Sequence, residues 1–510
     1  MRRLCVLLSA ALFFASAFAR DARAVDIRVD GDYRLRLAFN TDLMLDDANY
    51  RLNQTAWAEH RLRLNPKIVD EGVVEIQASF DILSGLIGGE LAPGFQGLGW
   101  DGRAVRDGLH GAGFDFRHFF AEVRFPVGLL QVGQMPSQWG LGMVANGGDD
   151  GIQPDFGDVR FGDIVERVLF ATRPLAFLGP HSELAQHLST ALAGDLVYRD
   201  RTASLLINDG GGLQVGDLAF QAVGVLRYSL SDKSVAGFYL ARRVESFAHD
   251  QGNLHIWIFD LHARTLFESK LFGGSTLALE TELAQINGGT SHSVNLNSLV
   301  STRVNQQGAV LRATLSVSQL ETELEGGYAS GDSNPFDSDN AAFVFNRDYK
   351  VGLVLFDEVL LFQSQNSARR LADPRLSGRP PNGVDLIPTE GAVTDALYLK
   401  PTMRYRPALF AGRVRLVGSV LWAHAPQPYT DAYNSLLASS PRNTFNAPAG
   451  QNYGVELDGA ISYRQKIGTE VGLEFGVQSG VLFPGNAFNR PDGTRMDKAY
   501  ATKFRAGVTF

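Results

Sequence analysis

The last thirteen residues, 498–510, read KAYATKFRAGVTF and alternate between apolar and polar side chains. One face carries Tyr500, Phe504 and the terminal Phe510, and the other carries Lys503 and Arg505. A strand with one apolar and one charged face suits a β-barrel that has lipid outside and water inside. The pattern predicts the closing strand of an outer-membrane barrel, with Phe510 as the recognition signal for the barrel-assembly machinery.

The same two-residue period recurs along the chain, most clearly at 27–39, 74–82, 311–317 and 455–483. Within 455–483 only Ile467-Gly468-Thr469 separates two alternating segments, and outer-membrane barrels use such tight turns on the periplasmic side. In the second segment the pattern predicts that Phe475 faces lipid together with Leu473 and Val477. Glu474 and Gln478 are then expected to face the lumen.

Counting these segments predicts an all-β, transmembrane antiparallel barrel of about 18 strands, with 16 as the alternative because bacterial barrels have even strand numbers. The expected strand centres are Arg34, Arg63, Gln77, Val123, Gln131, Val168, Leu196, Val223, Tyr239, Phe259, Leu279, Thr314, Glu323, Thr402, Ser419, Ala460, Phe475 and Phe504. Long connections fall at 84–113, 141–162, 287–305, 330–394 and 425–450, and we expect them to be extracellular or, for 330–394 in particular, folded into the lumen. A soluble β-sandwich is the competing architecture, and the contrast between tight turns and long loops favours the barrel.

The N-terminus has the features of a secretory signal peptide. Arg2 and Arg3 precede an apolar run from Leu4 to Phe14, which is too short to cross a bilayer as a helix. Small-residue cleavage sites follow, so we expect residues 1–24 to be removed by cleavage after Ala19 or Ala24 and 25–510 to form a single barrel domain. Cys5, the one cysteine, lies in the signal, and the mature chain would therefore have no disulfide or thiolate chemistry.

Composition and motifs exclude several classes of function. The formal net charge is -8, which argues against a nucleic-acid-binding protein. After the signal there is no run of about 20 apolar residues, so transmembrane helices are not expected. The histidines match no metal-binding or nucleophile-activating pattern, and no Gly-x-Ser-x-Gly sequence is present, so we expect no enzymatic activity.

The predicted inward faces carry many arginines and many carboxylates. Arg404, Arg406, Arg413 and Arg415 stand out because the stretch from Tyr398 to His424 contains no acidic residue. One interpretation is a set of mutually compensating ion pairs that stiffens the wall. The other is a pore-lining path that binds carboxylate or phosphate groups of anionic solutes, formed by these four arginines together with Arg312 and Arg464.

Two acidic clusters fall in predicted loops. Asp332, Asn334, Asp337 and Asp339 place four oxygen-bearing side chains within eight residues, a spacing that permits a Ca²⁺ site but is also typical of turns. Asp149, Asp150, Asp155 and Asp158 form a second cluster in a glycine-rich loop. No other cofactor is expected.

Two segments resemble known families. Residues 127–146, VGLLQVGQMPSQWGLGMVAN, resemble the strand and inward loop of many Gram-negative porins. Residues 326–361 begin GGYASGDSNPFD and resemble a phrase of alginate-export-type outer-membrane barrels, although Asn346-Arg347-Asp348-Tyr349 stands where those proteins have a His-containing stretch. The resemblance implies a porin-like or polysaccharide-exporter-like barrel in the outer membrane of a Gram-negative bacterium.

We therefore expect a channel that passes small or polymeric, anionic solutes. The alternative is a structural or adhesive barrel that segment 330–394 plugs. The sequence leaves open which solute passes, in which direction it moves, and whether the barrel is a monomer or a trimer. Lipid and the barrel-assembly machinery are the expected partners.

Overall fold

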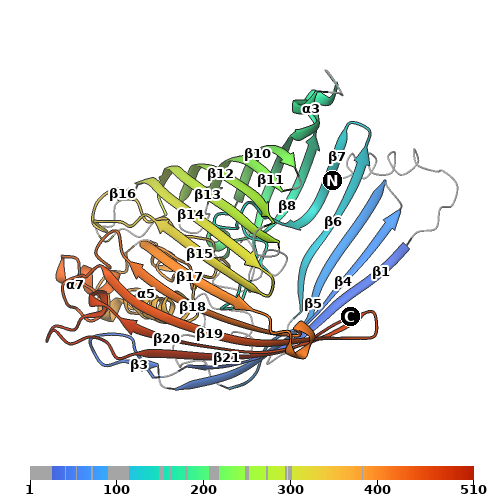
Figure 1. The fold of residues 1–510 in the computed structure, drawn as a ribbon. Coiled ribbons are helices and arrows are strands. Elements are labelled where there is room, and N and C mark those ends of the chain that lie inside the picture. The colour runs from blue at the N-terminus through green and yellow to red at the C-terminus, as the bar shows by residue number, and fades with distance from the viewer. Residues whose placement is uncertain are drawn as a thin grey trace.

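A computed structural model describes residues 26–40, 42–52, 54–70, 73–89, 114–148, 154–159, 162–177, 182–205, 218–231, 233–246, 252–270, 274–292, 296, 301–381 and 383–510. The predicted signal peptide, residues 1–24, lies outside these residues. The chain forms one sheet of nineteen strands, in which the two-residue β16 pairs in parallel with β14. The other eighteen strands are antiparallel and close into a ring, because β1 pairs with both β4 and β21 (Figure 1). The prediction of 18 strands is confirmed, and the alternative of 16 is wrong.

Each of the eighteen barrel strands contains one of the strand centres expected from the sequence. Their bounds are β1 Asp26–Asn40, β4 Thr55–Asp70, β5 Val74–Gly89, β6 Asp115–Phe125, β7 Gly128–Pro136, β8 Ile164–Thr172, β9 Leu188–Arg199, β10 Leu218–Ser231, β11 Ser234–Ser246, β12 Asn253–Ser269, β13 Ser275–Thr290, β14 Thr302–Val317, β15 Leu320–Ala329, β17 Ala396–Tyr405, β18 Val414–His424, β19 Asn452–Ile467, β20 Val471–Pro484 and β21 Ala499–Thr509. Three short strands lie in the connections, namely β2 Leu43–Met44, β3 Arg51–Leu52 and β16 Asp339–Asn340.

The helices in the described residues are short and lie in the connections between strands. The α-helices are α3 Glu183–His187, α4 Arg201–Leu205, α5 Leu361–Ala372, α6 Pro374–Ser377 and α7 Ala432–Ala438. A π-helix, η4 Leu355–Leu360, leads into α5, and 3₁₀ turns occur at η2 Pro174–Phe177, η5 Val384–Leu386, η6 Leu409–Gly412 and η7 Asn486–Phe488. Within the described ranges, no helix is both long enough and apolar enough to span a bilayer.

The strands bury polar residues and expose apolar ones, the reverse of a soluble sheet. On β17, Leu399 and Met403 are exposed, whereas Lys400 and Thr402, which point to the inside of the ring, are buried. On β20, Phe475 is 50% exposed and Gln478 is 6% exposed, as the alternation predicted. A continuous outer surface of this kind needs an apolar solvent, so the wall has the pattern of a membrane-spanning barrel.

The periplasmic and extracellular ends of the barrel can be distinguished by the lengths of their connections. The start of β1 and the end of β21 lie at one end, and α5 and α7 lie at the other (Figure 1). Connections at the first end include the tight turns 126–127, 318–319 and 468–470, whereas the second end carries 330–395 and 425–451. This asymmetry matches periplasmic turns and extracellular loops.

The seam between β1 and β21 is closed by the terminal residue. The backbone N–H of Gly31 donates to the carbonyl of Phe510 at 2.8 Å, and the N–H of Phe510 donates back at 3.0 Å. Gly31 leaves room for the terminal ring, because a methyl group there would lie 2.5 Å from Cζ of Phe510. The last side chain therefore covers the start of the first barrel strand.

Candidate functional site

Described residues of the connection 137–163, between β7 and β8, contact opposite sides of the barrel wall. In the ring, seven strands lie between β8 and β17, and seven lie between β7 and β18. The loop thus starts on the wall opposite β17 and β18, yet its Asp155 contacts arginines on both of those strands. The described residues of this loop therefore narrow the barrel from one side to the other.

The first half of the loop is held by carboxylates of β12 and β13. The indole N–H of Trp139 donates to Oδ1 of Asp260 at 2.9 Å, and the backbone N–H of Met143 donates to Oε1 of Glu282 at 3.1 Å. Glu282 also accepts the backbone N–H of Leu141. Gly140 has φ +53°, and a methyl group there would lie 2.6 Å from Glu282 Oε2, so the close approach requires glycine.

Two aspartates at the tip of the loop meet four wall arginines. Asp155 accepts from Nε of Arg404 at 2.7 Å and also pairs with Arg415. Asp158 lies 3.3 Å from Nε of Arg36 and also pairs with Arg505. Burial alone would raise the pKa of Asp155, but the hydrogen bond and charge of Arg404, assisted by Arg415, hold the pKa below its ordinary value. The tip is therefore fixed as a carboxylate.

Gln478 on β20 aligns the backbone of the same tip. Its amide Nε2 donates to the carbonyl of Asp155 at 3.0 Å, and its Oε1 accepts the N–H of Gly157 at 3.2 Å. This inward position was predicted from the alternation of the strand. A neutral side chain that donates and accepts can hold a backbone segment between two ion-paired carboxylates without adding charge.

The predicted arginine path differs from the structure in two ways. Arg404 and Arg415 do lie inside the ring, but they have acidic partners; Arg404 also binds Glu321 at 2.8 Å and Glu323 at 3.0 Å. Arg406 and Arg413 are exposed in the turn between β17 and β18, because β17 already ends at Tyr405. The prediction of four unpaired inward arginines is therefore wrong. The partners of Arg404 and Arg415 come from β15 and from a loop distant in sequence, and Arg406 and Arg413 lie outside the strands.

Arg312 and Arg464, the two remaining candidates, also have carboxylate partners. Arg312 Nη2 lies 2.8 Å from Glu325 and donates to the hydroxyl of Tyr349 at 3.2 Å. Arg464 lies 3.1 Å from Glu474 near the turn at 468–470. Arg312 thus joins the wall to the connection between β15 and β17, and Arg464 forms an exposed pair at the periplasmic end.

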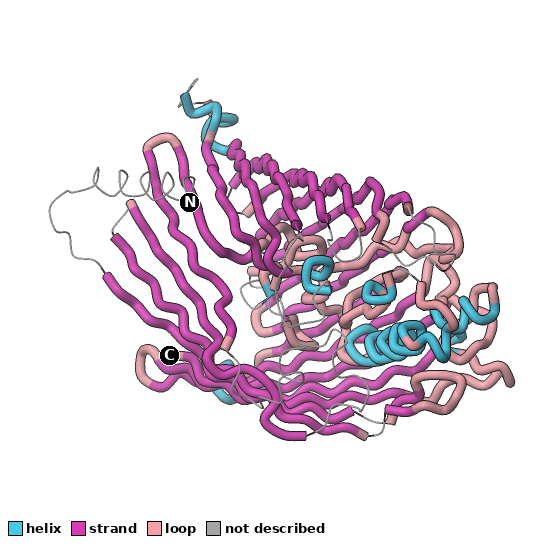
Figure 2. The backbone as a smooth tube through the Cα atoms, turned by 180° about the vertical axis from the view of Figure 1, so that it is seen from behind, coloured by secondary structure: helices cyan, strands magenta, loops and turns pink. Residues whose placement is uncertain are grey.

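The connection 330–395 packs against the inner wall. Its apolar core includes Phe343, Phe345 and Phe356, each at most 1% exposed, in contact with the wall residues Leu421 and Leu482. Figure 2 shows α5 and the surrounding loops enclosed by strands at one end of the barrel. One side of the lumen is thus filled by a dry, protein-like core.

Wall charges fix this connection through its backbone and its helix start. Glu456 on β19 accepts the N–H groups of Leu353, Val354 and Leu355 at 2.6, 2.8 and 2.6 Å. Lys503 on β21, which the sequence predicted to face the lumen, pairs with Asp357 at 2.6 Å and with Glu358 at 3.0 Å. These contacts hold the N-terminal end of η4 against β19 and β21, where the helix dipole favours a carboxylate such as Glu456.

The proposed calcium ligands act as turn residues in the structure. Asp332 accepts the N–H of Asn334 at 2.9 Å, and Asp337 accepts the N–H of Asp339 at 2.8 Å. Asp339 itself binds Arg303 through two hydrogen bonds of 2.8 and 2.9 Å. Across the residues that the structure describes, no group of three or more His, Cys, Asp or Glu side chains is arranged to hold a metal ion. Asp149 and Asp150 lie outside the described residues.

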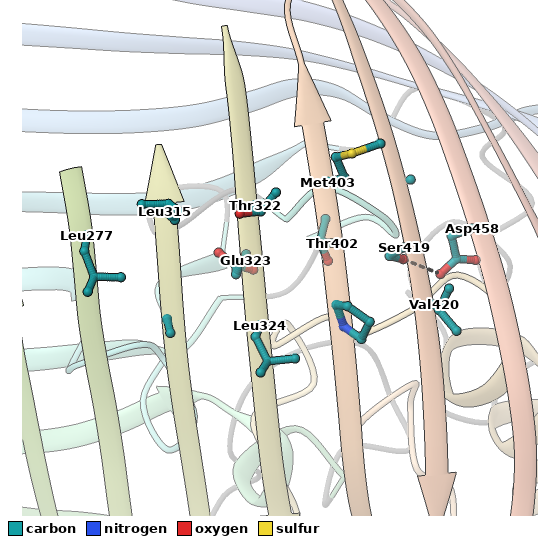
Figure 3. A pocket seen from close by; sticks show the side chains of 13 residues that line it. Leu277, Leu315, Thr322, Glu323, Leu324, Thr402, Met403, Ser419, Val420 and Asp458 are labelled. Carbon is teal, nitrogen blue, oxygen red and sulfur yellow. Dashed lines mark hydrogen bonds between the residues drawn. The ribbon is translucent and has the colours of Figure 1, made fainter. Parts of the chain in front are cut away.

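A pocket of about 650 Å³ lies in the wall formed by β13 to β19 (Figure 3). Its apolar side chains, including Leu315, Leu324 and Met403, are exposed on the outer face. Pro401 lies in the same wall, and the pairing of β17 with β18 skips Lys400 and Pro401, because proline has no N–H to donate. The lining also includes the buried residues Glu323, Thr402, Ser419 and Asp458, so the pocket lies within the wall, with its apolar side chains on the outer face.

Comparison with known proteins identifies the fold. No protein-family model matches the chain, and no curated protein sequence matches it. OpdL of Pseudomonas aeruginosa matches with a TM-score of 0.51 at 11% identity, over 95% of this chain and 98% of OpdL. The fold is that of an outer-membrane porin.

Two further solved structures support this porin fold. OccAB1 of Acinetobacter baumannii matches with a TM-score of 0.50 at 10% identity, over 94% of this chain and 97% of that one. OccK2 (OpdF) of Pseudomonas aeruginosa, solved in complex with glucuronate, matches with a TM-score of 0.50 at 8% identity, over 95% and 97%. At these identities the similarity concerns the architecture of the barrel.

Proposed function

We propose that this protein is an outer-membrane channel for small polar solutes, narrowed by the loop 137–163 and by the connection 330–395. The observation that carries the proposal is the access of solvent to charged side chains at the constriction. Arg415 and Arg505 lie inside the ring and are ion-paired to the loop tip, yet their side chains are 28% and 23% exposed. Water therefore reaches the ion pairs at the loop tip, as is expected in a barrel of this size.

We infer that the preferred solutes carry a carboxylate. The four arginines at the tip share five carboxylates, those of Asp155, Asp158, Glu59, Glu321 and Glu323. A simple excess of positive charge therefore does not favour anions. Exchange of carboxylates favours anions instead. A solute carboxylate can replace Asp155 on Arg404 and Arg415 and form the same paired hydrogen bonds. The glucuronate in the OccK2 structure is a solute of this class, and the resemblance to alginate-export-type barrels extends the proposal to anionic sugar polymers.

Planar-bilayer recordings with the purified full chain test the proposal. We expect ohmic conductance, with glucuronate added on one side causing transient blockades that neutral glucose does not cause. Equal effects of the two sugars would contradict the preference for carboxylates. Absence of conductance from correctly inserted, heat-modifiable protein would contradict the channel itself.

A plugged barrel is the second candidate, and the dry core of the connection 330–395 favours it. Phe343 and Val359 are fully buried, and a core of this kind has the packing of a folded domain and not of a mobile lid. This candidate predicts no conductance unless the core is loosened by substitution. The same bilayer measurement therefore decides between the two.

We also propose that the chain reaches the outer membrane of a Gram-negative bacterium after a signal peptide is removed by cleavage after Ala19 or Ala24. The lipid-facing wall and the position of Phe510 at the closing seam support this location. N-terminal sequencing of protein purified from outer membranes tests it, and we expect the mature chain to begin at Arg20 or Val25.

A further inference from the structure

Two adjacent arginines on β11 lie on opposite faces of the barrel wall. Arg243 points to the inside, is 8% exposed, and is ion-paired with Asp200 and Glu245. Arg242 points outward, because it alternates with Arg243 and lies between the outward positions of Leu240 and Val244. Many large apolar side chains are exposed on the outer surface of the wall, and Arg242 is a cation on this face.

Among the residues that the structure describes, the guanidinium of Arg242 has an aromatic neighbour but no acidic partner. Its Cζ lies 5.3 Å from the centre of the Trp257 ring on the adjacent strand β12, and Trp257 is itself exposed on the outer face. In the part of the chain that the structure describes, Arg242 has no ion pair and no side-chain hydrogen bond. Arg303, an outward arginine of β14, differs in this respect because Asp339 binds it through two hydrogen bonds.

A histidine lies on the same face next to this pair. His255 precedes Trp257 by two residues on β12, is exposed, and faces Val244 of β11 across the ladder. Its ring likewise has no hydrogen bond within the described ranges. Asn287 of β13 lies opposite Trp257 and adds an outward amide at the same register. A cation, an imidazole and an amide are therefore grouped around one exposed indole.

The height of this group places it where the apolar belt ends. Arg242 is four residues before the end of β11, at the end of the barrel that carries the long connections. Toward the other end, the next outward side chains on β12 are the exposed Phe259 and Leu261. The group therefore lies at the boundary between lipid chains and headgroups of the extracellular leaflet, where tryptophan is enriched.

We propose that Arg242, Trp257 and His255 form a binding site for the phosphate-bearing headgroup of an outer-leaflet lipid. The guanidinium supplies a planar pair of donors that matches a phosphate, and the indole face holds it in position from behind. His255 adds a donor from the neighbouring strand, and the acyl chains lie along Phe259 and Leu261. An unpaired cation at a lipid boundary is costly unless an anion meets it, and phosphate is the anion available in that layer. The site lies outside the lumen, so the inference holds whether or not the barrel conducts.

Native mass spectrometry of the full chain in detergent tests the proposal. The probe is a bisphosphorylated glucosamine-disaccharide glycolipid, compared with the same glycolipid after removal of its phosphates. Arg242→Gln is expected to lower the affinity for the phosphorylated form about tenfold, because charge-assisted hydrogen bonds to the phosphate are lost. Arg303→Gln is the matched control, because it removes an outward arginine that already has a partner, and its affinity should stay within about twofold of the parent.

The outcomes distinguish specific binding of the lipid phosphate from glycolipid binding that does not depend on Arg242. Arg242→Lys keeps the charge but loses the planar fork, so we expect an affinity between those of the parent and Arg242→Gln. Heat-modifiable gel mobility verifies that each variant is folded. Equal affinities of Arg242→Gln and Arg303→Gln would overturn the proposal, as would equal binding of the two glycolipids by the parent. Displacement of the glycolipid by inorganic phosphate would show a free-anion site and refute the assignment to a lipid.

Discussion

Asp155→Asn is expected to raise the anion-to-cation permeability ratio of the channel. Asp155 pairs with Arg404 and Arg415 at the far wall of the lumen. Arg404 keeps Glu321 and Glu323 when Asp155 is neutralised, whereas Arg415 loses the acidic partner that it has among the described residues. The substitution preserves the size of the side chain, so its main effect is one uncompensated positive charge in the path.

The size of the effect follows from the exposure of Arg415. Its side chain is 28% exposed, so we use the dielectric constant of water, about 80, for its interaction with a passing ion. A unit charge about 4 Å from a passing anion is then worth about 1 kcal/mol, roughly a fivefold change in local anion concentration. The anion-to-cation permeability ratio should rise by about this factor at low salt. At about 1 M salt the screening length falls to about 3 Å, and most of the change should disappear.

Reversal potentials across a salt gradient measure this ratio in single channels. Asp492→Asn is the matched control, since it makes the same chemical change in an exposed extracellular loop. Acid should have the same effect as the substitution. The pKa of Asp155 lies below its ordinary value of 3.8, so the ion pairs of Asp155 with Arg404 and Arg415 are complete above pH 3.8. They are lost as the pH falls through the lowered pKa. An unchanged permeability ratio in Asp155→Asn, with intact conductance, would refute the role of the loop tip.

Three further predictions concern the barrel and the inner segment. Glu456→Gln leaves one of three backbone N–H groups facing an amide N–H, at a cost of about 1 to 3 kcal/mol. The substitution should increase both protease cleavage within 330–395 and conductance. An unchanged digestion pattern would contradict the role of Glu456 in holding this connection. Phe475→Lys places a charge on the lipid face at a cost of about 2 to 4 kcal/mol near mid-bilayer, which folding titrations in lipid vesicles should detect, with Glu474→Gln as control. Deletion of Phe510 removes the seam contact with Gly31 and should reduce insertion yield on heat-modifiable gels without changing the conductance of the channels that do insert.

The barrel was predictable because its signal is local. Membrane strands repeat every two residues, so Phe475 and Gln478 reveal their faces without knowledge of their neighbours. The tight turn predicted at 467–469, which the structure places at 468–470, likewise indicates which strands are adjacent. The end of β17 at Tyr405 could not be predicted, because Arg406 continues the two-residue alternation of Arg404 although it lies in the turn after the strand.

The constriction could not be predicted in the same way. Arg404 and Asp155 are 249 residues apart in sequence, and no local pattern relates them. The acidic cluster containing Asp155 and Asp158 was visible in the sequence, but its composition does not indicate which side chains it contacts. A signal was available in the porin-like segment 127–146, which resembles an inward loop and so implied that the residues after it approach the opposite wall.

The way in which the wall holds its loops differs from the way in which it selects solutes. Glu282 and Glu456 accept backbone N–H groups of the two inner segments, and these groups are present whatever the side chains of the segments are. The charges that face the solute, by contrast, are divided between wall arginines and the loop carboxylates Asp155 and Asp158. Substitution in the loop tip can therefore change the charge of the path while the wall carboxylates still hold the loop in place. On this argument, selectivity resides in a few loop side chains, and the position of the constriction resides in the barrel.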